Sequence, residues 1–452
     1  MPLTADPVRQ QYEDYPFPKV DPADESRRLQ IMPQDALLTI SHRCFAGRRD
    51  LRQGCRVLVA GGGTGHASVF LAEQLRGTGS EIVQLDLSRA SLDIAKARVA
   101  RRGLDVTFLH GSLLDLPKMD LGAFDYINCT GVLHHLPDPD AGLAALTSVL
   151  DESGAMGLMV YGRYGRRHVY VLQDLLRRLR AADDSSSDRI RHAYAMMETL
   201  PPWFYASTGI HQARHIEAFR RDETNVVDTF LHAQDRAYTV DEVYELVEGA
   251  GLCFNGFASF QATLEGRMWM NPLRFVRDPE LRERIAAASP REQAAIAELV
   301  HPRVELHSFY VSFRNPTAAS PDDDDLVPEV NGLRLAGQPL FEPFDGPTIA
   351  AFLRAQAGGI STISHPTGRR TFLSNEAITA ALVEGIDGKR TSGDICRRAQ
   401  SLTGATRGMV RETWASVLAS LGEIDWVLLR HRDIAPYASY DDLQAHMSEN
   451  PA

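Results

Sequence analysis

The chain of 452 residues is long enough for two or three domains, and its 44 % of hydrophobic residues can give each domain its own core. It carries 48 Lys and Arg against 59 Asp and Glu, a net charge of −11 at pH 7, so its overall field repels nucleic-acid phosphates and anionic lipids. We therefore expect neither a nucleic acid nor a membrane as a partner.

The five cysteines are scattered, without a C-x-x-C pair or a Cys/His spacing that would gather four zinc ligands. We expect reduced thiols and no metal site. The N-terminus has no apolar signal segment, and no stretch approaches the roughly 18–20 apolar residues that cross a bilayer. The sequence thus predicts a soluble, cytoplasmic protein.

Residues 1–50 form an N-terminal segment that contains the motif QYEDYPFP. Its two prolines favour an extended path that could fold over the mouth of a site, like a lid. Tyr12 and Tyr15 would then touch a ligand or an acceptor. The alternative, that Tyr12, Tyr15 and Phe17 only anchor the segment to the core, stays open.

Residues 51–315 alternate short apolar or β-branched runs with segments of helical period, a pattern typical of a parallel sheet covered by helices. The pattern predicts an α/β domain with seven strands, at residues 55–60, 81–86, 106–110, 124–130, 154–161, 252–259 and 305–313.

A long gap after the fifth predicted strand indicates a helical cap inserted at about residues 163–250. Arg163 and Tyr164 open this insertion and could form a positive rim for a substrate. The motif DTFLHAQDR forms a polar cluster that could bind an acceptor, made by Asp228, His232, Asp235 and Arg236. A structural salt bridge or helix cap is the alternative for each residue of this cluster, and a solvated helix start is the alternative for the positive rim.

The composition changes after the last predicted strand. Residues 316–330 contain four successive aspartates, Asp322 to Asp325, and are predicted to be a solvated acidic linker. Residues 331–440 show helices followed by a terminal strand, which indicates a winged-helix-like domain. Residues 441–452 form a tail.

The first strand runs directly into a glycine-rich turn made by Gly61, Gly62, Gly63 and Gly65. Glycines allow the backbone to approach a ligand, and the following helix offers its N-terminal N–H groups. The next strand ends in Asp86, 21 residues after Gly65, where a carboxylate can accept both hydroxyls of a ribose. The sequence therefore predicts a nucleoside-bearing cofactor.

A dinucleotide fingerprint, G-x-G-x-x-G, needs a third glycine at the position of His66 or Ser68, depending on where counting starts. Neither residue is glycine, so an NAD-dependent dehydrogenase is a disfavoured alternative.

Four motifs together resemble the class I S-adenosylmethionine-dependent methyltransferases: VLVAGGGTG, EIVQLDLSRASLDIAKARV, FLHGSLLDLP and FDYINCTGVLHHLPDP. The resemblance implies a Rossmann-like sheet, S-adenosylmethionine as the cofactor and S-adenosylhomocysteine as its product. With YEDYPFP and DTFLHAQDRAYTVDEV, it narrows to a bacterial subgroup of these enzymes.

The same resemblance implies cofactor contacts at Gly61, Gly62, Gly63 and Gly65 for the methionine part, Asp86 and Leu87 for the ribose and adenine, Ser112 and Leu113 for the adenine, and Cys129 and Thr130 for the sulfonium region. Two positions depart from the family pattern. Val59 replaces an acidic residue of the first strand, and Ser112 stands where an adenine-contacting Asp is usual, so Asp115 is a candidate substitute.

His134 and His135 follow the fourth predicted strand, where this fold exposes its reaction side, and an imidazole titrates near neutrality. They are the candidate catalytic bases, together with Tyr15 of the N-terminal segment. The alternative is that the two histidines open a helix and pack against the sheet.

Three hypotheses about the function stay open, two of which differ in the acceptor. The C-terminal domain faintly resembles PqqD-like winged-helix domains that bind precursor peptides, which favours methylation of a peptide or protein. A small-molecule metabolite enclosed by the cap is the second hypothesis, and a non-catalytic scaffold that only binds the cofactor is the third. The [DNS]-P-P-Y motif of enzymes that methylate planar amino groups is absent after the fourth strand, and a homodimer stays open.

Overall fold

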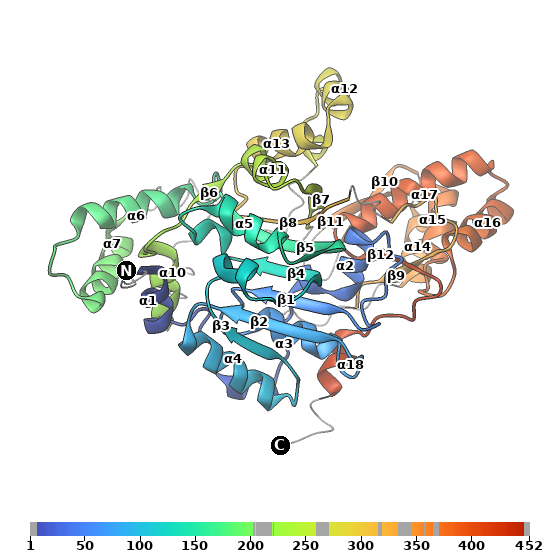
Figure 1. Cartoon of the computed structure of the whole chain (residues 1–452). Helices are drawn as coiled ribbons and strands as arrows, with labels where there is room; N and C mark the ends of the chain where they lie inside the picture. The colour runs from blue at the N-terminus through green and yellow to red at the C-terminus, as the bar shows by residue number, and fades with distance from the viewer. Residues whose placement is uncertain are drawn as a thin grey trace.

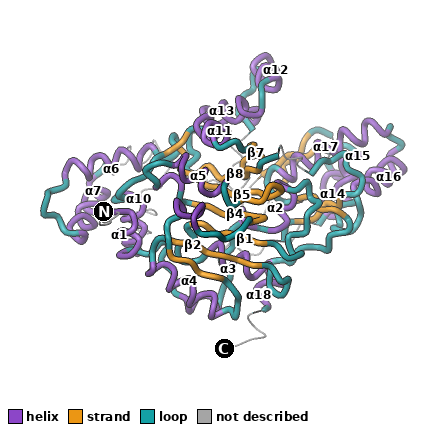
Figure 2. The backbone as a smooth tube through the Cα atoms, in the orientation of Figure 1, coloured by secondary structure: helices purple, strands orange, loops and turns teal. Residues whose placement is uncertain are grey.

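The protein is described here by a computed structural model, which covers residues 7–201, 204, 219, 221–258, 271–314, 319–332, 345–356, 358–364 and 370–446 (Figures 1 and 2). Parts of the predicted N-terminal segment, linker, C-terminal domain and tail lie outside these residues, at 1–6, 316–318, 333–344 and 447–452. Within the described residues, no helix combines the length and apolarity that crossing a lipid bilayer requires.

A sheet of eight strands forms the centre of the molecule (Figure 1). Its order is β3-β2-β1-β4-β5-β8-β7, with β6 paired to the end of β5; β8 runs antiparallel to both β5 and β7, and the other pairs are parallel. The strands are β1 (Arg56–Ala60), β2 (Glu81–Asp86), β3 (Thr107–His110), β4 (Phe124–Thr130), β5 (Leu150–Gly162), β6 (Ala237–Tyr238), β7 (Cys253–Phe257) and β8 (Leu306–Ser312).

The predicted Rossmann-like α/β sheet is therefore confirmed. The seven predicted strands are all present, within a few residues of their expected ends. The eighth, β6, has only two residues, too few to give an alternating pattern that a sequence could reveal.

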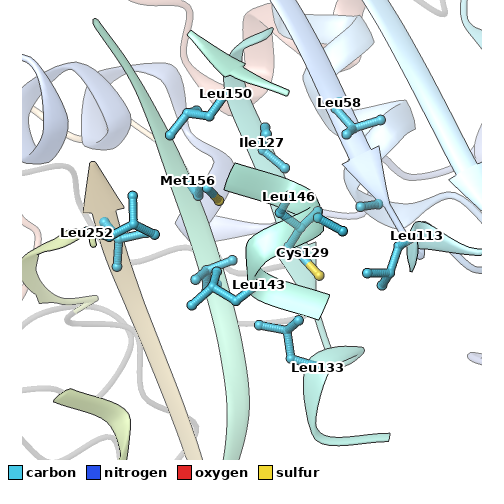
Figure 3. Close-up of a cluster of buried hydrophobic side chains, with 14 of the residues drawn as sticks. Leu58, Leu113, Ile127, Cys129, Leu133, Leu143, Leu146, Leu150, Met156 and Leu252 are labelled. Carbon is cyan, nitrogen blue, oxygen red and sulfur yellow. The ribbon is translucent and has the colours of Figure 1, made fainter. Parts of the chain in front are cut away.

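Alternate side chains of the strands face two helical layers. Leu58 and Ala60 of β1 join the cluster under α5 and α11, whereas Val57 and Val59 join the cluster under α2 and α3. Figure 3 shows the first cluster, with Cys129 among leucines of α5. The sheet helices are α2 (Leu37–Cys44), α3 (His66–Gln74), α4 (Arg89–Arg101), α5 (Pro139–Thr147) and α11 (Val240–Gly249), and α12 (Pro279–Ala287) and α13 (Pro290–Val300) follow β7.

The helical cap has its own apolar core, to which Leu172, Ala193, Val226 and Phe230 contribute. Its helices are α6 (Arg167–Leu179), α7 (Ser186–Thr199) and α10 (Glu223–Phe230). The inserted unit is smaller than the predicted 163–250, because α11 buries Val243 in the core of the sheet instead of in the cap.

The N-terminal segment begins with α1 (Pro7–Asp14), which lies beside α10 (Figure 1). The expected extended path is wrong for Tyr12, which lies on this helix. The two prolines of the motif, Pro16 and Pro18, come only after the helix has ended, so they do not restrict its residues.

The C-terminal unit packs around its own core, centred on the fully buried Trp414. It contains α14 (Gly346–Ala355), α15 (Ala377–Glu384), α16 (Ser392–Thr403), α17 (Arg407–Gly422) and two antiparallel strand pairs, β9 (Leu326–Val330) with β12 (Val427–His431) and β10 (Ile360–Ser364) with β11 (Arg370–Ser374). The last element is α18 (Tyr440–Ala445). The winged-helix assignment stays a prediction.

The acidic linker is shorter than predicted. The expected solvated stretch, 316–330, includes the buried strand β9, whose residues alternate too little in polarity to be recognised next to four aspartates. Three of those aspartates are ion-paired, Asp323 with Arg48, Asp324 with Arg411 and Asp325 with Arg432. The acidic run therefore contacts the folded units on either side.

Candidate active site

The glycine turn after β1 has a backbone that only glycine adopts easily. Gly61, Gly63 and Gly65 have φ angles of +72°, +52° and +91°. A Cβ atom on Gly61 would lie 2.3 Å from a methyl group of Val132, and one on Gly63 would lie 2.7 Å from the carbonyl oxygen of Phe17. The turn is thus held between the N-terminal segment and the loop after β4, and it leads into the N-terminus of α3.

Asp86 ends β2 directly beside this turn. Its side chain is buried, and its carboxylate accepts the N–H of Gly63 at 2.7 Å and the N–H of Ser88 at 2.8 Å. Burial raises the pKa of Asp86, while these hydrogen bonds act in the opposite direction. A carboxylate fixed next to a glycine turn, at the carboxyl end of a parallel strand, fits the recognition of a ribose.

The other predicted cofactor residues differ in whether their side chains or only their backbone groups are available to a cofactor. Leu113 and Cys129 have side chains in the apolar core under α5, and burial raises the pKa of Cys129 to about 12, so only their backbones are available to a ligand (Figure 3). Ser112 caps the short 3-10 helix η3 (Leu113–Lys118) by accepting the N–H of Leu114. The hydroxyl of Thr130 accepts a hydrogen bond from Asn128 at 3.0 Å.

Two further turn residues have local roles. The carbonyl of Leu87 accepts a hydrogen bond from His110 at 3.1 Å. A Cβ atom on Gly62 would lie 2.5 Å from the side chain of Gln84, which in turn donates to the carbonyl of Gly63. Gly62 therefore supports the turn from the sheet side.

The two candidate bases lie in a single 3-10 turn, η4 (Leu133–His135), immediately after β4. His134 is fully buried, with its ring 3.8 Å from that of Tyr161 on β5. His135 is 5 % exposed and stacks on His232, which follows α10 in the cap, with ring centroids 3.8 Å apart and an interplanar angle of 19°. The structure thus joins a residue of the sheet to a residue of the inserted cap.

One residue, Gln234, fixes the proton positions of both stacked rings. Its N–H donates to Nδ1 of His232 at 3.0 Å, and its carbonyl accepts from Nδ1 of His135 at 2.9 Å. A neutral His232 therefore carries its proton on Nε2, whereas a neutral His135 keeps a lone pair on Nε2. The backbone of this one residue makes Nε2 of one ring a donor and Nε2 of the other an acceptor.

Tyr12 of α1 continues this hydrogen-bond chain. Its hydroxyl lies 3.1 Å from Nε2 of His232 and donates to Asp228 of α10 at 3.0 Å. Tyr161 donates to the second oxygen of Asp228 at 3.4 Å. Burial raises the pKa of Asp228 to about 6.

The buried histidines are neutral near pH 7. Burial lowers the pKa of His135 to about 4 and the pKa of His232 to about 2. The cationic Arg166 acts in the same direction on both pKa values, and its guanidinium lies 3.5 Å above the ring of Tyr161. His135 is therefore an unprotonated base.

Within the described residues, His135, Asp228 and His232 place one ligand atom each within 4.8 Å of one another, as a metal site would. A cation would need a lone pair on Nε2 of His232, however. That position is protonated while the N–H of Gln234 binds Nδ1. The hydrogen bonds thus favour proton transfer over metal binding.

A cavity of about 560 Å³ lies between α1 and the cap helices, and His232 and Tyr15 are among its lining residues. Its size is in the range of sites that enclose one small ligand. Sequence reasoning thus named two residues that the structure brings to one cavity.

The other predicted substrate residues lie elsewhere. Arg163 is paired with Glu242 at 2.6 Å, and neither Arg163 nor Tyr164 is among the described residues that line the cavity. Asp235 accepts a hydrogen bond from Gln173 at 3.1 Å, beside the histidines.

Tyr161 is a member of the site that was not predicted as a site residue. Asp228 belongs to the polar cluster that the sequence indicates, and it precedes His232 by four residues at the end of a helix, the spacing that places two side chains on one face. Nothing local marks Tyr161, which lies within an apolar strand.

Comparison with known proteins agrees with this geometry. Residues 58–156 match the family described as methyltransferase domain. An uncharacterised protein of Synechococcus sp. is 31 % identical over 267 residues, and a ubiquinone biosynthesis O-methyltransferase of Aromatoleum aromaticum is 27 % identical over 128 residues. These alignments cover 58 % and 28 % of this chain, and the chain spans 60 % and 50 % of the two relatives' lengths.

Among solved structures, PKMT2 from Rickettsia typhi has a similar fold, with a TM-score of 0.59 at 14 % identity over 89 % of this chain and 76 % of that one. The same protein in complex with AdoHcy gives a TM-score of 0.57 over 88 % and 75 %. Residues 58–156 therefore form a class I S-adenosylmethionine-dependent methyltransferase domain, as the sequence motifs predict, and the glycine turn and Asp86 fit that cofactor.

Proposed function

We propose that the protein is a methyltransferase that moves the methyl group of S-adenosylmethionine to an acceptor at the carboxyl end of β4. The observation that carries this proposal is that the loop after β4, whose Val132 packs against Gly61 of the cofactor turn, also carries the unprotonated His135, which stacks on a residue of the cavity wall. His134 and Tyr15 were predicted as catalytic partners. In the structure His134 supports the ring of His135, and Tyr15 faces the cavity.

S-adenosylmethionine supplies an electrophilic methyl group on a sulfonium. The chain then has to orient the acceptor, exclude water and remove a proton from it where the nucleophile carries one. Nε2 of His135 is the proton acceptor in this proposal, because its lone pair is set by the carbonyl of Gln234. Asp228, within 4.8 Å of the ring, offsets the charge that His135 gains.

Two acceptor classes follow from the sequence and the cavity. A peptide or protein is the first, supported by the C-terminal unit, whose strand β10 pairs on one side only within the described residues. A small molecule is the second, and the cavity volume of about 560 Å³ supports it. In a non-catalytic scaffold, the cofactor turn would be closed off from any acceptor cavity. The stacking of His135 on His232, a residue of the cavity wall, instead supports a link between the loop after β4 and the cavity.

The test uses tritiated S-adenosylmethionine with the full-length protein. We expect binding that falls at least about tenfold in Asp86→Ala, because the lost hydrogen bonds involve a charged group. Asp93→Ala, an exposed carboxylate on α4 that pairs with Lys96 on the surface, is the matched control and should bind normally. Unchanged binding in Asp86→Ala would remove the ribose role.

The acceptor class is read from the same label. After incubation with a cell extract separated by size, tritium in the macromolecular fraction supports a peptide or protein acceptor, and tritium in the small-molecule fraction supports a metabolite. No transfer to either fraction, together with normal cofactor binding, would favour the scaffold.

A further inference from the structure

The cavity beside the histidines has an apolar wall. Besides His232, it is lined by Leu176 of α6, by Val227 and Phe230 of α10, and by Leu231. Such a wall excludes water from an apolar body and stabilises its binding by the hydrophobic effect.

The same cavity carries an excess of basic side chains. Arg177, Arg180 and Arg189 line it, against two carboxylates, Asp14 and Asp184. Asp184 already accepts the N–H of Ala181 at 2.9 Å. A local positive excess in a chain with a net charge of −11 is a feature that the composition does not explain.

Two of these arginines have N–H groups available for a ligand. The Nε of Arg189 is buried and has no hydrogen-bond partner among the described residues, while Nη2 donates to Ser186 at 3.1 Å. Arg180 follows the last turn of α6, and the described part of the chain gives it no carboxylate partner within ion-pair distance. Arg177, by contrast, is paired with Asp174 at 3.0 Å.

The register of α6 sets the distance between Arg180, at the basic end of the cavity, and Gln173, which also lines it. Gln173, Leu176 and Arg180 recur at three- and four-residue spacing, so they share one face of the helix. Gln173 lies at the inner end, where it donates to Asp235. Arg180 lies about 10 Å further along the axis, given a rise of about 1.5 Å per residue.

We propose that the cavity binds an acceptor that carries a carboxylate on an apolar body, with the carboxylate held by Arg180 and Arg189 and the nucleophile at the end of the cavity lined by His232, the residue that stacks on His135. This proposal rests on the proposed function, since it assigns the substrate class of the same site.

The experiment measures binding of ω-hydroxydecanoate, an apolar chain with a carboxylate at one end and a hydroxyl at the other, by titration calorimetry in the presence of S-adenosylhomocysteine. Decanediol, which lacks the charge, is the matched neutral probe. We expect the carboxylate to bind about tenfold more tightly than the diol, and added salt to reduce the difference.

The double variant Arg180→Gln/Arg189→Gln should lose this preference and still bind the diol. Arg178→Gln is the control, because Arg178 is an exposed neighbour on α6 that does not line the cavity. Equal binding of both probes to the wild type, no binding of either at millimolar concentration, or a preference that survives in the double variant would each overturn the proposal. Binding of S-adenosylhomocysteine alone, measured first, separates this failure from failure of the proposed function.

Discussion

Gln234 holds two stacked imidazoles in opposite protonation patterns, and this residue-level detail decides which ring can act as a base. His135 has a free lone pair on Nε2, whereas His232 presents a proton to Tyr12. Because both rings are buried, neither gains a proton easily near pH 7. The site therefore offers one lone pair, on Nε2 of His135, as its proton acceptor.

The first prediction concerns His135→Asn. This change removes the proton acceptor but keeps a side chain of similar polarity, so we expect kcat to fall by about 10²–10⁴, the usual contribution of general-base catalysis. The affinity for S-adenosylhomocysteine should stay unchanged, because the ring does not belong to the glycine turn. Transfer rates and calorimetric titration measure the two quantities.

The pH dependence of the transfer activity gives a second test of His135 as the proton acceptor. The pKa of His135 is lowered to about 4, so the loss of activity that comes from His135 itself should appear only as the pH approaches 4, below the step near pH 6 at which Asp228 gains its proton. The residual activity of the variant should lack this acidic limb. An identical limb in both proteins would assign the proton acceptor to another group.

Residue types with a local signature could be predicted, and those that depend on long-range pairing could not. The glycine turn and Asp86 lie at the ends of two successive strands, so their proximity follows from the parallel sheet alone. Tyr12 and Asp228 are 216 positions apart in the chain, and their hydrogen bond depends on how the cap docks. No periodicity in either segment contains that information.

At the scale of single elements, two adjacent residues in the last turn of α1 bind it to different parts of the molecule. Tyr12 reaches the cap, and the carboxylate of Glu13 accepts the N–H groups of Arg89 and Ala90, both at 3.0 Å, at the N-terminus of α4. A negative charge at this position interacts favourably with the helix dipole. The lid-like segment is thus attached to the strand-end region by polar contacts, not only by burial.

The second prediction is that Glu13→Gln loosens α1. The amide keeps one acceptor oxygen but loses the charge, so we expect several-fold faster amide hydrogen exchange in residues 7–14, in line with about 0.5–1 kcal/mol for a charge at a helix end. Asp14→Asn is the matched control, since Asp14 is exposed and hydrogen-bonded only to Gln10 among its described neighbours.

Acid should act on wild-type α1 in the same direction as the substitution. The hydrogen bonds lower the pKa of Glu13 in the folded protein, so its contribution to docking is present above the pKa of the unfolded chain and is lost as the pH falls through the folded value. The protection factors of residues 7–14, which are exchange rates corrected for their intrinsic pH dependence, should therefore fall in acid in the wild type and less so in Glu13→Gln. An equal fall in both would show that other groups control the docking.

The elements differ in how well the sequence predicts them. The sheet strands have apolar runs that match their buried faces, and they appear within a few residues of their predicted ends. For α1 the prolines of the motif indicated an extended path, but the helix ends before them. The strand β9 is stabilised by its antiparallel partner β12, almost 100 positions away, and not by a pattern of its own.

At the scale of the whole molecule, a buried ionic network joins the two ends of the described chain. Glu25, in the 3-10 helix η1 (Pro22–Ser26), accepts from Arg98 at 2.7 Å and from Arg102 at 2.6 Å, both on or next to α4. Arg102 also binds Glu73 of α3, which lies 2.9 Å from His446 after α18. The N-terminal segment and the C-terminal helix thus share one set of charges.

The third prediction is that Glu25→Gln strongly destabilises the protein. The glutamine would leave Arg98 and Arg102 buried with one carboxylate, Glu73, instead of two. Removing one partner of a buried charge pair costs about 3–5 kcal/mol, because the remaining charge stays desolvated. Urea denaturation monitored by circular dichroism measures the loss, with Asp24→Asn as the control. Asp24 is the adjacent exposed carboxylate, paired only with Arg27 on the surface, and its substitution should change stability by less than about 1 kcal/mol.

The ionic network also predicts an effect of Glu25→Gln on a distant element, α1. If η1 is released in Glu25→Gln, the segment that carries α1 loses an anchor, so the exchange of residues 7–14 should rise even at urea concentrations where the sheet remains folded. A variant that unfolds at lower urea without earlier exposure of α1 would show that the network stabilises only the packing of α3 and α4. Earlier exposure would show that the lid-like segment depends on charges more than 10 residues away in the sequence, where η1, α3 and α4 meet the residue that follows α18.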